Sequence, residues 1–88
     1  MYTIIHTWIS KNNNDIPEAG GNVYGLYSSL EEAKIGLNQW IMSTPSDGCK
    51  FVKVSDEKCS ITSPDRKTKG YVKIVKIEPV WFKVNQKI

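Results

Sequence analysis

The sequence predicts a single small α+β domain over residues 1–88, with one helix packed on a mainly antiparallel sheet. Segments rich in β-branched and aromatic residues recur along the chain, as strands require. One central segment instead has its apolar residues at helical spacing. Turn-forming residues separate these segments, and the expected order of elements is β-β-α-β-β.

The first strand is expected at "YTIIHTWI" (2–9), because this segment is rich in β-branched and aromatic residues. Neither of its alternating faces is purely polar, which places the strand inside the sheet. The next segment, "SKNNNDIPEAGGN" (10–22), is rich in Asn, Gly and Pro and is expected to form an exposed loop. A short second strand is expected at "VYGLY" (23–27).

A capping pattern predicts where the helix begins. Ser29 is the expected cap, and Glu32, three residues later, completes a capping box. The apolar residues that follow share one helical face: Leu30, Ala33, Leu37, Trp40 and Ile41. Gly36 lies within this pattern and permits close approach of the helix to the sheet, and Pro45 ends the helix.

The second half of the chain is expected to complete the sheet. A third strand is predicted at 49–55 and a fourth, the most regular, at 71–77. Between them, the polar segment 56–70 is expected to be a turn-rich loop, which would expose the Cys59 thiol. A short edge strand is expected at 80–84, where the preceding proline is tolerated.

The segment "GLYSSLEEA" (25–33) joins a short strand directly to the helix. It resembles a junction in small uncharacterised bacterial and phage domains, where the pattern is G-[VIL]-[FY]-[ST]-S-x-E-E-A. The matching residues are Gly25, Leu26, Tyr27, Ser28, Ser29, Glu31, Glu32 and Ala33. This resemblance implies a β-β-α-β-type fold, and it transfers no catalytic residue because those domains carry no established activity.

The residues that could support catalysis or metal binding are few. No glycine precedes a Lys-Ser or Lys-Thr pair, so a P-loop is excluded. His6 is the single histidine, and Cys49 and Cys59 lack the spacing of a zinc site. We therefore expect no catalytic residue, no metal and no cofactor.

Two features of the chain predict its location. The N-terminal segment lacks the basic and apolar regions of a signal peptide. No run of residues approaches the roughly 20 apolar residues of a membrane helix. We expect a cytoplasmic protein with reduced thiols and no membrane association.

The net charge of +3 is concentrated in the second half of the chain. The segment "SPDRKTKGYVKIVK" (63–76) surrounds Tyr71 with basic residues: Arg66, Lys67, Lys69, Lys73 and Lys76. An aromatic among cations on a sheet can bind single-stranded nucleic acid. Because the segment lacks an RNP-type motif, we expect such binding to be weak and independent of sequence. Strand lysines also protect sheet edges from aggregation, which is the structural alternative.

Trp81 and Phe82 are adjacent and must point to opposite faces of the predicted edge strand. One of them would be exposed and would bind a protein partner or a second copy of the chain as a homodimer. The leading hypothesis is a small non-catalytic binding protein, such as a phage-encoded inhibitor or anti-defence accessory protein that acts on a host factor. A weak nucleic-acid-binding module is the alternative.

Overall fold

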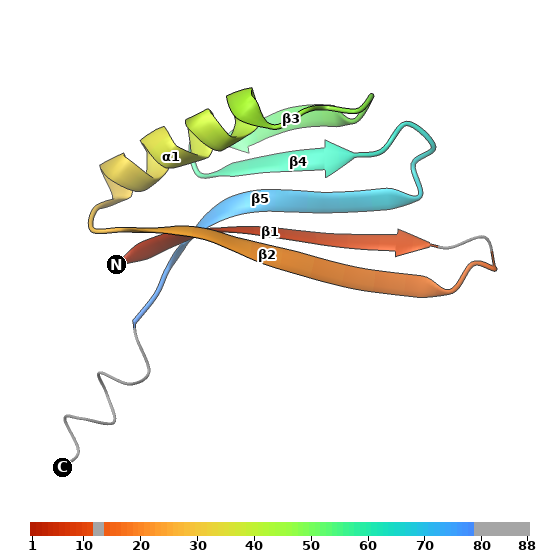
Figure 1. Cartoon of the computed structure of the whole chain (residues 1–88), viewed down its shortest axis with the longest axis horizontal. Helices are drawn as coiled ribbons and strands as arrows, with labels where there is room; N and C mark the ends of the chain where they lie inside the picture. The colour runs from red at the N-terminus through yellow and green to blue at the C-terminus, as the bar shows by residue number, and fades with distance from the viewer. Residues whose placement is uncertain (12–13, 79–88) are drawn as a thin grey trace, which may run out of the picture.

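The computed structural model describes residues 1–11 and 14–78, and in it one helix lies against one face of a five-stranded antiparallel sheet (Figure 1). In chain order the elements are β1 (Tyr2–Lys11), β2 (Pro17–Tyr27), α1 (Leu30–Ser43), β3 (Lys50–Ser55), β4 (Lys58–Thr62) and β5 (Thr68–Lys76). The predicted α+β class is confirmed. The order differs from the prediction, because three strands follow the helix within the described residues.

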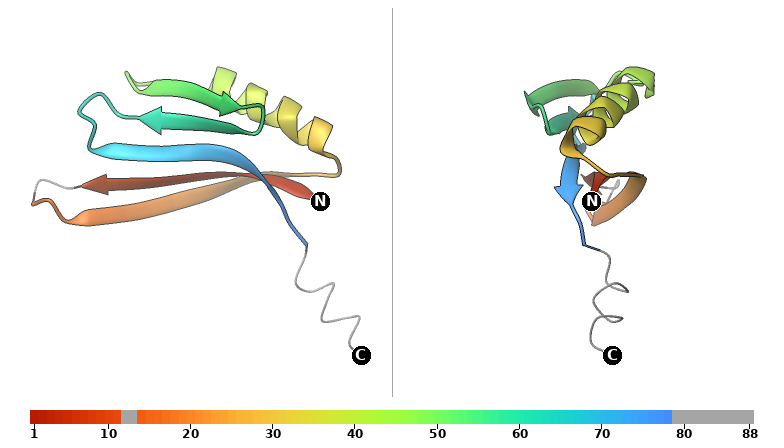
Figure 2. Two further views of the ribbon diagram at one scale, coloured as in Figure 1. Left: turned by 180° about the vertical axis from the view of Figure 1, so that it is seen from behind. Right: turned by 90° about the vertical axis from the view of Figure 1, so that its left-hand side faces the viewer.

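The strands lie side by side in the order β2-β1-β5-β4-β3, and every neighbouring pair is antiparallel. β1 pairs with β2 on one side and β5 on the other, which confirms its predicted position inside the sheet. α1 leaves the edge strand β2 and leads to the opposite edge strand β3, so the helix crosses the sheet (Figures 1 and 2).

The expected loop at 10–22 is largely strand, so this prediction is wrong. β1 continues to Lys11, and β2 begins at Pro17. The glycines that suggested a loop serve close packing instead: a Cβ at Gly20 would collide with the indole ring of Trp8 on the neighbouring strand. Strand pairing with β1 therefore overrides the turn-forming composition of this segment.

The expected loop at 56–70 is also wrong in part, because it contains β4. Asp56 and Glu57 form the tight turn that returns the chain from β3 into β4. The Cys59 side chain is 2% exposed and packs in the core, where an exposed loop thiol had been expected. The predicted strand at 80–84 lies outside the described residues.

The core lies between α1 and the sheet. Its largest fully buried side chains are Ile4, Leu37, Cys59 and Val72. Trp40, from the predicted apolar face of α1, packs with ring centroids 5.7 Å from Tyr24 and 6.5 Å from Phe51. These contacts reach from β2 to β3, the two edges of the sheet, so a single side chain helps to hold both edges under the helix.

The start and the end of α1 agree with the sequence. Ser29 Oγ accepts a hydrogen bond from the Glu32 N–H at 3.2 Å, which is the predicted cap. The Glu32 carboxylate accepts a bond at 2.9 Å from the Ser28 hydroxyl, whereas the predicted capping box has it accept from the Ser29 N–H. The helix ends at Ser43, two residues before Pro45. No helix in the part of the chain that the structure describes has the length and apolarity needed to cross a membrane.

Candidate binding face

One face of the sheet is not covered by α1, and we call it the open face. Side chains alternate between the two faces of a strand, so the registers assign every second residue to it. Its described residues are Thr3, Ile5, Thr7, Ile9, Lys11, Pro17, Ala19, Gly21, Val23, Lys50, Val52, Ser55, Lys58, Ser60, Thr62, Lys69, Tyr71, Lys73 and Val75.

The open face combines exposed aliphatic side chains with lysines. Ile9, Val23 and Val52 are 63%, 68% and 44% exposed. The lysines come from β1, β3, β4 and β5: Lys11, Lys50, Lys58, Lys69 and Lys73. No Asp or Glu is among the open-face residues defined above. This face is therefore both apolar and positively charged.

Tyr71 stands near the middle of the open face and is 44% exposed. Lys58 Nζ lies 4.1 Å from the centroid of its ring, within the range of a cation–π interaction. The ammonium group therefore occupies one side of the ring. The aromatic side chains that pack against the core, such as Trp40 and Phe51, lie on the helix side of the sheet.

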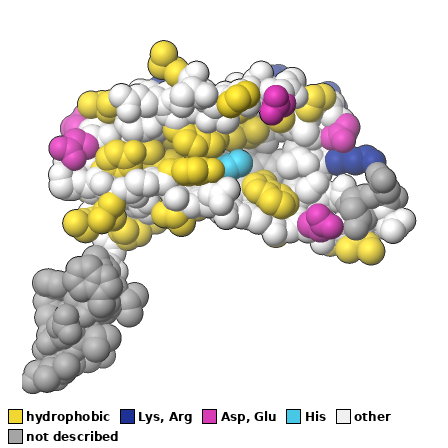
Figure 3. Space-filling model, viewed as in Figure 1, with side chains coloured by type: hydrophobic (Ala, Val, Ile, Leu, Met, Phe, Trp, Pro, Cys, Tyr) yellow, Lys and Arg dark blue, Asp and Glu magenta, His cyan; other side chains and the backbone are white. Residues whose placement is uncertain are grey.

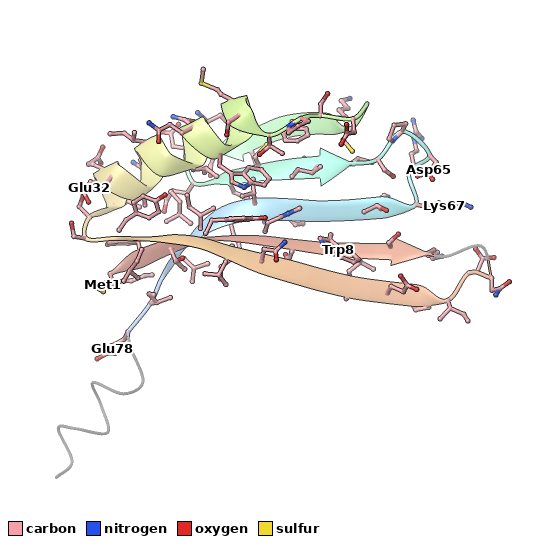
Figure 4. All side chains as sticks on the ribbon, viewed as in Figure 1. Met1, Trp8, Glu32, Asp65, Lys67 and Glu78 are labelled. Carbon is pink, nitrogen blue, oxygen red and sulfur yellow. The ribbon has the colours of Figure 1, made fainter. Side chains whose placement is uncertain are left out.

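Basic residues gather at the end of the open face where β4 turns into β5, and Figure 4 labels one of them, Lys67, at this turn. A hollow of about 710 Å³ has Ile9 and Tyr71 in its lining. The cations in its lining are Lys11, Arg66, Lys67 and Lys69. They come from two segments that are far apart in the sequence, and the Lys11 N–H donates to the Lys67 carbonyl at 3.1 Å, which holds these segments together.

The turn that presents these cations is fixed by its own hydrogen bonds. The Asp65 carboxylate accepts from the Ser63 hydroxyl at 2.6 Å and from the Lys67 N–H at 2.9 Å. These bonds lower the pKa of Asp65. Arg66 has a φ of 62°, in the left-handed region, and its N–H donates to the Ser63 carbonyl at 3.0 Å. The turn is therefore a defined conformation.

The structure brings together most of the residues that the sequence suggested for nucleic-acid binding. Arg66, Lys67, Lys69 and Tyr71 line the hollow, and Lys73 lies on the same face. Lys76 lies on the other face of β5, so it does not join them. The proposed partner-binding residues Trp81 and Phe82 lie outside the described residues.

Sequence reasoning missed the lysines contributed by other strands. Lys11 belongs to a segment expected to be a loop, and Lys58 belongs to β4, which was not predicted. Alternating polar and apolar residues at "KCSIT" (58–62) were the available signal. Placing Lys58 beside Tyr71 also requires the pairing of β4 with β5, which local pattern does not show.

The helix side of the sheet carries a hydrophobic band with the single histidine within it (Figure 3). The His6 ring lies 5.3 Å from the Trp40 ring, and burial lowers the pKa of its imidazole. His6, Glu18 and Cys49 line one hollow of about 370 Å³ on this side. Across residues 1–11 and 14–78, no group of three or more His, Cys, Asp or Glu side chains is arranged to hold a metal ion.

No protein-family model, curated protein or solved structure matches the chain. A proposal for function therefore starts from the open face and its chemistry.

Proposed function

We propose that this protein is a non-catalytic binding protein whose open face docks a protein partner with an apolar and acidic surface. One observation carries the proposal: exposed aliphatic side chains and lysines share an uncovered sheet face that has no carboxylate among its described residues. Exposed apolar patches with a polar surround mark interaction sites. A positive face selects a negative partner and speeds its association.

Two observations favour a protein partner over single-stranded nucleic acid. Tyr71 is the only aromatic side chain among the open-face residues, whereas single-strand binding commonly uses several stacking aromatics. The ring of Tyr71 is also already in contact with Lys58. The exposed side chains around it, such as Ile9 and Val52, are aliphatic and suit the apolar centre of a protein interface.

A phage-encoded inhibitor or anti-defence protein that blocks a host factor would be a binding protein of this kind. Its action would require only occupation of a surface on the host factor by the open face. The positive charge of this face directs the proposal toward acidic host surfaces.

A capture experiment with matched variants tests the proposal. The purified protein is immobilised, exposed to cell lysate with and without nuclease, and the retained proteins are identified by mass spectrometry. Ile9→Asp changes the open face, and Met42→Asp makes the same change on α1, where Met42 is 86% exposed. We expect one partner to be retained by the wild type and by Met42→Asp, and to be lost with Ile9→Asp.

Other outcomes would contradict this proposal. Retention that is abolished by nuclease, together with binding of labelled oligo-dT, would favour the nucleic-acid alternative. Such binding should weaken steeply with salt, because it depends on the release of counterions. Retention that is unchanged by Ile9→Asp would place the binding surface elsewhere.

A further inference from the structure

The two edges of the sheet differ in how they are protected. The edge strand β3 carries Lys50 and Lys53, and its register with β4 shifts between Lys53 and Ser55. Edge lysines and β-bulges are both devices that keep an edge strand from pairing with another chain. β3 therefore has the features of an edge that stays unpaired.

The opposite edge, β2, lacks these features along most of its length. It has 11 residues, none of which is Lys or Arg, and Glu18 is its single charged residue. Its proline, Pro17, is the first residue of the strand. The N–H and C=O groups of the residues that follow can therefore still form hydrogen bonds with another strand. The register shift between β1 and β2 lies at the other end, where Tyr2 pairs with Tyr27 and Ile4 with Tyr24.

The segment from Glu18 to Tyr24 is thus a continuous strand with a free edge. No other described segment runs alongside this edge in Figures 1 and 2. Most of its side chains are exposed, including Val23 at 68%. A backbone edge of this length offers a row of N–H and C=O groups for strand addition.

We propose that β2 pairs antiparallel with β2 of a second copy, so that the protein forms a two-fold symmetric dimer with one continuous sheet. The composition of β2 makes this pairing self-complementary. With the two-fold axis at Gly21, Glu18 faces Tyr24 of the second copy and Ala19 faces Val23, so that no like charges meet. Self-pairing of β3 would place Lys50 opposite Lys53 of the second copy if the axis lay between Phe51 and Val52.

This geometry has a consequence for the open face. In an antiparallel pair, residues directly opposite each other point to the same face of the sheet. The two-fold axis therefore runs perpendicular to the sheet, and the open faces of both copies lie on the same side. The dimer would present one doubled surface of aliphatic and basic side chains.

Sedimentation equilibrium of the purified protein over a range of concentrations tests this proposal without any partner. We expect a mass that rises toward twice the 10.0 kDa of the chain. The double variant Ala19→Lys, Val23→Lys places lysines opposite one another across the dimer and should raise the dimer Kd at least about tenfold. Val52→Lys is the matched control on β3, and it should dimerise as the wild type does.

Hydrogen exchange of segment 17–27 in the wild type provides a measurement that needs no variant. In the dimer, outward-facing amides of β2 gain partners, so their exchange should slow as the protein concentration rises. A wild type that stays monomeric at all concentrations would overturn the proposal. So would a dimer that is lost with Val52→Lys and kept with the double variant, or exchange in 17–27 that is independent of concentration. Any of these results would contradict the dimer without contradicting the proposal that the open face binds a protein partner.

Discussion

Gly36 of α1 and Tyr27 of β2 occupy one small space, because a Cβ at residue 36 would collide with the phenol group of Tyr27. The two residues lie in the helix and in the strand that leads into it. Gly36 is buried, so the missing side chain brings the backbone of α1 down onto the Tyr27 ring. The glycine expected to allow close approach has this role in the structure.

Gly36→Ala should therefore destabilise the protein. Alanine is about 1 kcal/mol more favourable than glycine within a helix. Overpacking a filled site costs about 1–3 kcal/mol, so we expect a net loss of about 1 kcal/mol in the free energy of unfolding. Denaturant unfolding measures it, with Asn38→Ala at an exposed position of α1 as control. A stabilised Gly36→Ala variant would show that Tyr27 can move away.

Ser29→Ala should lower the free energy of unfolding by about 1 kcal/mol. The substitution removes the oxygen that accepts the Glu32 N–H at the start of α1. Ser28→Ala is the control, because it removes an exposed bond to the Glu32 carboxylate and should change stability by less than about 0.5 kcal/mol. Thermal unfolding of both variants distinguishes the two roles, and equal losses would argue against Ser29 as the cap.

His6 should make stability depend on pH. Burial lowers the pKa of its imidazole from the ordinary value of 6.5, so the unfolded chain binds a proton more readily than the folded chain. The contribution of His6 to the free energy of unfolding should therefore be constant above about pH 6.5, fall as the pH is lowered from there to the folded pKa, and level off below it. Urea unfolding at about pH 5.5 and about pH 7.5 measures this change. The decrease at the lower pH should be smaller in His6→Gln.

The two thiols should react at different rates in the folded protein. Cys59 is 2% exposed and burial raises its thiol pKa, whereas Cys49 is partly exposed. Iodoacetamide should label Cys49 first, because the reactive species is an accessible thiolate. Peptide mass spectrometry at successive times locates the label, and the same reaction in denaturant is the control. Faster labelling of Cys59 would show that β4 opens readily.

Local signals were sufficient to predict α1 and its ends. The Ser29 cap, the apolar face that includes Leu37, and the stop at Pro45 all depend on residues within a few positions of one another. The errors arose where a distant segment determines the structure. Gly20 belongs to a strand because Trp8 packs over it, and Cys59 belongs to a strand because β5 pairs with β4.

The candidate site was only partly predictable for the same reason. The cations at 66, 67 and 69 are neighbours in the sequence, so their cluster around Tyr71 could be recognised. Lys11 and Lys58 join that cluster through the order of the strands, which no local pattern encodes. That the described residues of the open face include no Asp or Glu becomes visible only when the registers are known.

The position of β5 determines when the sheet can form during synthesis. β5 is the last of the strands in the described residues, and it lies between the β1–β2 hairpin and the β3–β4 hairpin. Until residue 76 has left the ribosome, the two hairpins share no backbone hydrogen bond through the sheet. The sheet is therefore completed only after β5 has emerged. Until then, the edge of β1 that pairs with β5 in the folded sheet has no strand partner in the nascent chain. Such an edge is a site for chaperone binding and for misassembly between neighbouring nascent chains.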